Sequence, residues 1–143
     1  MDLTIRRPPE SVRAWWTDLP DDYHATDPEE QPYRIRTLHR EDARRQLLTY
    51  WRNPDGSTME LRETMTLRPD GSWAFDIEDA MGVRIHDEFR AEPQGDGGTL
   101  LHIESTLTPK GPEAVPVAEY IMADMREGWP RAAHICERDA PGL

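Results

Sequence analysis

The stretch AVPVAEYIMADMREGWPRAAHIC, residues 114–136, decides the fold expected for this sequence. Apolar side chains recur in it at intervals of three and four, which places them along one stripe of a helix. The stripe consists of Val117, Ile121, Met125, Trp129, Ala132 and Cys136, and it is widened by Ala118, Met122 and Ile135. Because Pro116 has no N–H to donate, we expect the regular helix to begin close to it, and we expect a kink at Gly128 and Pro130.

Upstream of this helix, apolar and polar residues alternate in segments that are separated by turn signals. Residues 54–57 and 69–72 both read PDGS, in which proline presets one backbone angle and glycine accepts a positive one. Alternating segments joined by such turns predict an antiparallel meander of about seven strands. The strands are expected at 2–6, 33–39, 44–52, 58–67, 73–77, 83–89 and 101–107.

The first strand runs directly into a helix. Pro8 and Pro9 end the strand, and proline is tolerated in the first turn of a helix. Trp15 and Trp16 then lie within helically spaced apolar residues, and the acidic segment 21–31 is expected to form a second short helix or a loop. The whole chain, residues 1–143, is therefore interpreted as one α+β domain, in which a curved antiparallel sheet wraps around the long C-terminal helix.

The charge and composition exclude several classes of function. The formal net charge is −11, which opposes binding to nucleic acids and to anionic membranes. Cys136 is the single cysteine, so no internal disulfide can form. No apolar run approaches the roughly 20 residues that span a bilayer, and the opening residues contain no signal-peptide core. A cytoplasmic protein without membrane insertion is expected, either a monomer or a homodimer.

Two segments and the final helix resemble one superfamily. Residues 5–18, IRRPPESVRAWWTD, residues 98–111, GTLLHIESTLTPKG, and the helix that contains Trp129 resemble START-like proteins, also called SRPBCC or Bet v 1-like, which have the helix-grip fold. Within this superfamily, the chain is similar to the polyketide cyclase/dehydrase and lipid-transport group. The resemblance implies a cavity for a small hydrophobic molecule, such as a lipid or a polyketide-like compound. The resemblance does not assign a catalytic role to any residue of this sequence.

No cofactor or metal is expected. A Rieske cluster would need paired cysteine and histidine ligands, which the chain lacks, and no spacing of its histidines matches a zinc signature. His86 and Glu88 share the face opposite Val83 and Ile85, which indicates an exposed outer face of the sheet.

Two carboxylates occupy strand positions that otherwise hold apolar residues. Glu63 shares a face with Met65, and Asp87 shares a face with Phe89. If these faces point inward, the carboxylates are costly to bury. They would then pair with Arg45 or Thr49, meet water in an open cavity, or have raised pKa values suited to acid–base chemistry. The alternative is a β-bulge that turns one or both outward.

The candidate ligand-binding residues combine these carboxylates with large apolar side chains that could reach the space between sheet and helix. They are Trp51, Glu63, Met65, Trp73, Asp87, Phe89, Tyr120, Met125 and Trp129. A well-packed domain without a cavity remains the alternative, because aromatic side chains fill cores equally well.

Three functions follow from this interpretation. The first is binding of a small hydrophobic or aromatic ligand. The second is a cyclase- or dehydratase-type enzyme that needs no cofactor and uses Glu63 and Asp87. The third is a protein-interaction module like the activators of Hsp90 ATPase, which share the fold.

Overall fold

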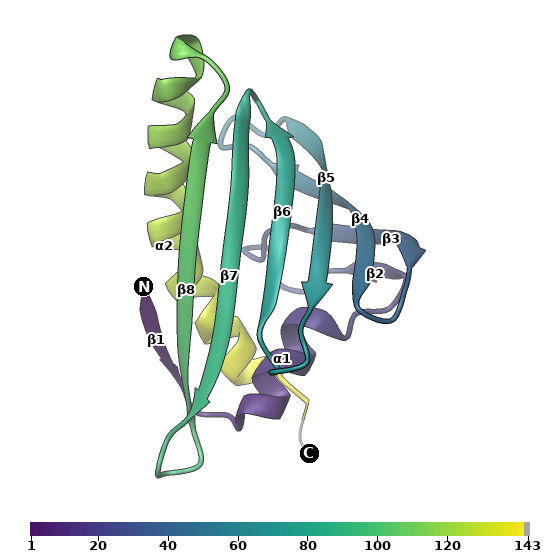
Figure 1. Cartoon of the computed structure of the whole chain (residues 1–143), viewed down its shortest axis with the longest axis vertical. Coiled ribbons are helices and arrows are strands. Elements are labelled where there is room, and N and C mark those ends of the chain that lie inside the picture. Colours follow the sequence, from purple (N-terminus) through teal and green to yellow (C-terminus); the bar gives the residue numbers. More distant parts are fainter. Residues whose placement is uncertain (142–143) are drawn as a thin grey trace.

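The computed structural model describes residues 1–141 and consists of a strongly curved sheet with two helices on its inner side (Figure 1). Its elements are β1 (Asp2–Ile5), α1 (Pro9–Thr17), β2 (Asp22–His24), β3 (Arg34–Arg40), β4 (Arg44–Arg52), β5 (Thr58–Leu67), β6 (Trp73–Ala80), β7 (Val83–Pro93), β8 (Thr99–Pro109), a short 3-10 helix (Pro112–Ala114) and α2 (Val115–Asp139). This is the expected α+β helix-grip arrangement.

The sheet has eight strands in the order β1-β8-β7-β6-β5-β4-β3-β2. From β2 to β8 the chain is a simple meander of antiparallel neighbours, while β1 crosses over to pair with β8. The β1–β8 pairing ends early: Asp2–Ile5 lie opposite Thr99–His102, Met1 exchanges two backbone hydrogen bonds with Ile103, and β8 beyond Ile103 forms a free edge of the sheet. The start of the chain and its last strand therefore lie side by side next to α2 (Figure 1).

The prediction of a second short helix after the first strand is wrong. Asp22–His24 form β2, an edge strand that pairs with β3 and makes eight strands instead of about seven. Extended backbone is favoured there because the Asp22 carboxylate accepts two hydrogen bonds of 3.0 Å from Arg34 on β3. Tyr23, the middle residue of β2, donates a hydrogen bond from its hydroxyl to the carboxylate of Glu30.

The two PDGS segments form tight turns, as expected. In the first, the carboxylate of Asp55 accepts a hydrogen bond of 2.9 Å from the backbone N–H of Ser57, and Asp70 does the same for Ser72. Gly56 has φ +87° and Gly71 has φ +89°, which side chains disfavour. These turns fix the register of β4, β5 and β6 in sequence.

Helix α2 begins at Val115 with Pro116 in its first turn, contains Pro130, and bends along its length (Figure 1). Its buried residues, Ala133, Ile135 and Cys136, all lie in the C-terminal part. Within the described residues, no helix is both long and apolar enough to cross a membrane.

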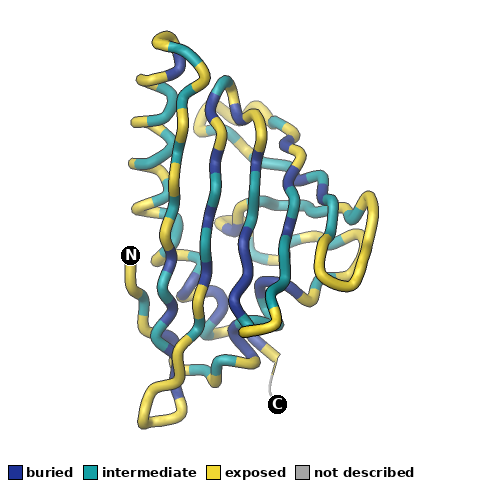
Figure 2. The backbone as a smooth tube through the Cα atoms, viewed as in Figure 1, coloured by how far each residue is buried: buried dark blue, intermediate teal, exposed yellow. Residues whose placement is uncertain are grey.

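The core consists of two clusters on the inner face. An aromatic cluster joins α1, the sheet and the end of α2, and its largest members are Trp16, Trp73, Phe89, Leu101 and Ile103. An aliphatic cluster lies beside the start of α2 and consists of Leu61, Ile77, Ala80, Val83, Ile85 and Ala114. The buried stretches of the sheet in Figure 2 correspond to these clusters.

Candidate functional site

Four polar side chains cross the inner face of the sheet at the level where the two apolar clusters adjoin. We call Thr49, Glu63, Asp87 and Ser105 the polar belt. Asp87 on β7 lies directly opposite Ser105 on β8. Glu63 on β5 lies opposite Leu47 on β4, two residues from Thr49 on the same face. The belt thus takes one residue from each of four strands, with β6 contributing apolar neighbours.

Both carboxylates lie on the inner face. Glu63 is 8% exposed and Asp87 is 5% exposed, and each alternates with buried apolar residues along its strand. The β-bulges of the sheet lie elsewhere, between Thr37 and His39 and between Ile77 and Ala80. A bulge therefore does not turn either carboxylate outward.

Burial raises the pKa of Glu63 to about 7. The nearby hydroxyl of Thr49 acts in the opposite direction, and the charge of Asp87 raises the pKa further. The Thr49 hydroxyl is itself fixed, since it donates to the backbone carbonyl of Leu61 at 3.2 Å and accepts from Trp51 Nε1 at 2.8 Å. This hydrogen bond to Thr49 fixes the indole of Trp51 beside the polar belt.

Burial also raises the pKa of Asp87, to about 6, while Ser105 and the charge of His86 lower it. Ser105 is close enough to affect this pKa, yet Asp87 Oδ1 and Ser105 Oγ are both buried without a hydrogen-bond partner. Two polar atoms that face each other across a strand pair thus remain unsatisfied, which is uncommon in a folded interior.

No cation compensates the two carboxylates. Arg45, an expected partner of the carboxylates, donates instead to the backbone carbonyl of Thr17. Among residues 1–141, every lysine or arginine ion pair involves other carboxylates. Glu63 and Asp87 therefore form a buried acidic pair with hydroxyl neighbours only.

The apolar stripe of α2 lies over this face without being buried. Its members at the start of the helix are all half-buried: Val117, Ala118, Ile121, Met122, Met125 and Trp129. No residue between Val115 and Trp129 is buried, in contrast to the C-terminal part of the same helix (Figure 2). The first half of α2 thus packs against the aliphatic cluster through side chains that stay partly exposed, and part of its apolar side is accessible.

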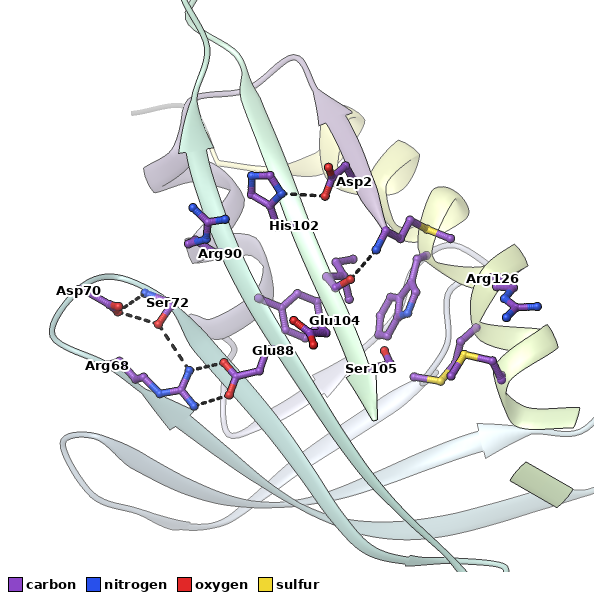
Figure 3. A pocket seen from close by; sticks show the side chains of 16 residues that line it. Asp2, Arg68, Asp70, Ser72, Glu88, Arg90, His102, Glu104, Ser105 and Arg126 are labelled. Carbon is purple, nitrogen blue, oxygen red and sulfur yellow. Dashed lines mark hydrogen bonds and ion pairs between the residues drawn. The ribbon is translucent and has the colours of Figure 1, made fainter. Parts of the chain in front are cut away.

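A hollow of about 870 Å³, open to solvent, reaches this region around the free edge of β8. On the inner side it is lined by Phe89, Ile103, Ser105, Met122, Met125 and Trp129. Charged residues of the outer face, such as Arg68, Glu88 and His102, line the rest (Figure 3). The inner and the outer lining residues lie on opposite faces of the sheet, so the hollow is a groove that continues around the sheet edge. Only its inner part, which Ser105 lines, borders the polar belt.

The predicted ligand-binding residues fall into three groups. Met65, Trp73 and Phe89 are buried at 1%, 0% and 1% exposure and fill the core. Trp51, Met125 and Trp129 are half-buried around the inner space. Glu63 and Asp87 form the third group, the buried carboxyls of the polar belt. A ligand contact of any of these eight residues stays a prediction.

Tyr120 requires a correction, because its side chain is 54% exposed and does not face the sheet. It lies one residue before Ile121, and successive helix residues are rotated by about 100°. Tyr120 therefore projects from the outer side of α2, away from the stripe.

The outer face, for which the sequence predicts a plain exposed surface, carries an ion-pair network. His86 Nδ1 contacts Asp76 and its Nε2 contacts Glu88 at 2.7 Å, while Glu88 also pairs with Arg68. The hydrogen bond to Asp76 is the main cause of a raised pKa of His86. Each nitrogen of His86 points to a different carboxylate, and no group of three potential metal ligands converges within the described residues.

Ser105 is the site residue that sequence reasoning missed. The signal was present, since Ser105 occupies the position between Ile103 and Leu107 where the alternation calls for an apolar side chain.

The described structure is similar to solved START-like proteins. It matches a START superfamily protein from Mycobacterium smegmatis with a TM-score of 0.62 and 12% identity, over 94% of each chain. It also matches the Zhui aromatase/cyclase from Streptomyces sp. R1128 with a TM-score of 0.65 and 14% identity, over 96% of this chain and 92% of that one. At such identities the likeness establishes the fold, which is START-like.

A third similar structure is the di-domain aromatase/cyclase BexL from the BE-7585A biosynthetic pathway, with a TM-score of 0.69 and 12% identity. The match covers 100% of this chain and 49% of BexL, so the chain spans about half the length of that protein. No protein-family model matches the chain, and no curated protein matches it.

Proposed function

We propose that this protein binds a small hydrophobic or aromatic molecule between the inner face of its sheet and the first half of α2. The observation that carries the proposal is the half-buried apolar stripe of α2, which a tightly packed domain would cover. Small-molecule sites are mostly apolar with a few convergent polar groups, and the polar belt supplies such groups. The START-like fold supports the same function.

In this proposal the ligand body packs against Met125, Trp129 and Trp51, the half-buried side chains around the space. Its polar substituents are oriented by Glu63 and Asp87. Phe89 and Trp73 form the floor behind Trp129, since the Phe89 and Trp129 rings meet edge to face at 5.4 Å.

Filling the space is expected to weaken this binding. Ala118→Phe adds a ring to the stripe of α2 and should weaken binding of the uncharged dye Nile red by about tenfold or more, about 1.4 kcal/mol. Ala123→Phe is the matched control, because Ala123 is exposed on the same helix and should leave affinity within about twofold. Fluorescence titration measures both.

Equal affinities of the two variants would contradict the proposed position of the ligand. If Nile red fails to bind the wild type, and native mass spectrometry of freshly purified protein also shows no retained compound, the binding function itself is overturned. That result would favour the alternative of a protein-interaction module, whose function should survive Ala118→Phe.

A second candidate function is favoured by the pKa of about 7 at Glu63, near the value at which a carboxyl group can both take up and release a proton. The protein would then act as a cofactor-independent enzyme at an enolisable ketone. We expect it to accelerate exchange of the α-protons of 2-tetralone in D2O, followed by NMR. Glu63→Gln should reduce that rate by about a hundredfold while Nile red still binds. Exchange at the buffer rate, or an unaffected variant, would refute this function.

A further inference from the structure

The polar belt has a charge that nothing in the protein balances. Two carboxylates, on β5 and β7, lie at 8% and 5% exposure on one face, and no arginine or lysine among residues 1–141 forms an ion pair with either. A buried charge without a partner is strongly unfavourable, so in the free protein the carboxyls avoid it by taking up protons, and a bound cation would instead stabilise their ionised forms.

An unsatisfied acceptor marks where such a partner would bind. Oδ1 of Asp87 is buried and accepts no hydrogen bond, and Oγ of Ser105, directly opposite on β8, is equally without a partner. Ser105 also lines the inner part of the groove with Met125 and Trp129. The unsatisfied atoms thus adjoin the accessible apolar side of α2.

Two arginines lie near the inner side, but within residues 1–141 neither forms an ion pair with the carboxylates. Arg45 shares the inner face of β4 with Leu47 and donates to the backbone carbonyl of Thr17, and Arg126 of α2 lines the hollow with Ser105. Glu63 is flanked by Leu47 and Thr49 on β4 and by Ile77 on β6, and Asp87 by Phe75 on β6 and Ser105 on β8. The apolar residues of α2 that pack against the aliphatic cluster are Val117, Ala118, Ile121 and Met125. The remaining charged neighbours of Asp87 are His86 and Asp76, on the opposite face of the sheet.

We propose that the ligand is a hydrophobic cation, an apolar or aromatic molecule that bears an amine whose ammonium group donates hydrogen bonds to Asp87 and Glu63. This inference rests on the proposed binding function and specifies its ligand class. The apolar body would lie against Met125 and Trp129, and the ammonium group would reach the polar belt.

The alternatives to an amine match the site less well. A neutral hydroxyl can satisfy Asp87 Oδ1 but leaves the negative charge uncompensated. A carboxylate adds a third negative charge to a region of low dielectric, where like charges repel strongly. Charge-assisted hydrogen bonds from an ammonium group to carboxylates are, in contrast, about twice as strong as neutral ones.

The test compares three molecules with one naphthalene body: 2-(1-naphthyl)ethylamine, 2-(1-naphthyl)ethanol and 1-naphthylacetate. At pH 8, calorimetry should give the amine about tenfold or greater affinity over the alcohol, with the acetate weakest. Lowering the pH from 8 to 5 should remove this preference in the wild type, because Glu63 and Asp87 take up protons with pKa values of about 7 and about 6 while the amine stays charged.

Variants locate the charge. Glu63→Gln and Asp87→Asn should each reduce the preference for the amine while the alcohol still binds. Glu60→Gln is the control, because Glu60 is exposed on the outer face of the same strand and its loss should leave the preference intact.

The outcomes are distinguishable. If the amine and the alcohol bind equally, or if the preference survives in both amide variants, the inference of a cationic ligand is overturned and the binding function stands. If none of the three molecules binds and Nile red also fails to bind, the proposed function is overturned as well.

Discussion

Replacing Phe89 with alanine is expected to lower the free energy of unfolding by about 4 kcal/mol, the range found for large aromatic side chains in cores. The ring is 1% exposed and stacks on Trp73 with ring centroids 5.4 Å apart. Phe75 and Trp129 meet it edge to face at 5.6 and 5.4 Å. Rings from β6 and α2, and Trp16 from α1, therefore border the cavity that the substitution creates, and they cannot all move to fill it.

Urea unfolding followed by tryptophan fluorescence measures the effect. Tyr120→Ala is the control, because Tyr120 is a large aromatic residue that is 54% exposed and should change stability by less than about 0.5 kcal/mol. A loss below about 1 kcal/mol for Phe89→Ala would show that the aromatic cluster does not form the core described above.

The sheet could be predicted from the sequence because its signals are local. The alternation in 58–67 and the two PDGS turns each depend on residues within one hairpin, and both are found as β5 and its flanking turns. β2 could not be predicted in the same way. Its three residues are extended because they pair with β3, twelve residues away along the chain, and pairing of this kind leaves little trace in a short segment.

The position of a site residue could be predicted where the alternation of side chains along a strand alone determines which face of the sheet it occupies. Glu63 and Asp87 lie on the inner face because no bulge interrupts their strands at those positions. Tyr120 was assigned to the ligand space for its aromatic character, although its helical position places it on the outer side of α2. The partial exposure of the apolar side of α2 could not be predicted, because it depends on how a helix packs against strands that are distant in sequence.

Lowering the pH from 8 to 5 is expected to stabilise the protein, and Glu63→Gln is expected to remove a large part of that effect. The pKa of Glu63 is about 7 in the folded protein and 4.5 ordinarily, so the folded state binds the proton more tightly than the unfolded state. This contribution is complete below about pH 4.5 and is lost as the pH rises through 7. The difference between the two pKa values corresponds to about 3 kcal/mol.

Denaturant midpoints of the wild type and Glu63→Gln at pH 5 and pH 8 measure this contribution. The amide cannot ionise, so the variant should exceed the wild type in stability at pH 8 by about 1–3 kcal/mol, with a smaller difference at pH 5. Asp87, with a pKa of about 6, and His86, with a raised pKa, act in the same direction but are common to both proteins. The contribution of His86 cancels in the comparison, whereas Asp87, whose charge raises the pKa of Glu63, enters the difference through that interaction. Parallel pH profiles would show that Glu63 meets water freely, and the buried acidic pair on which the cationic ligand depends would then not exist.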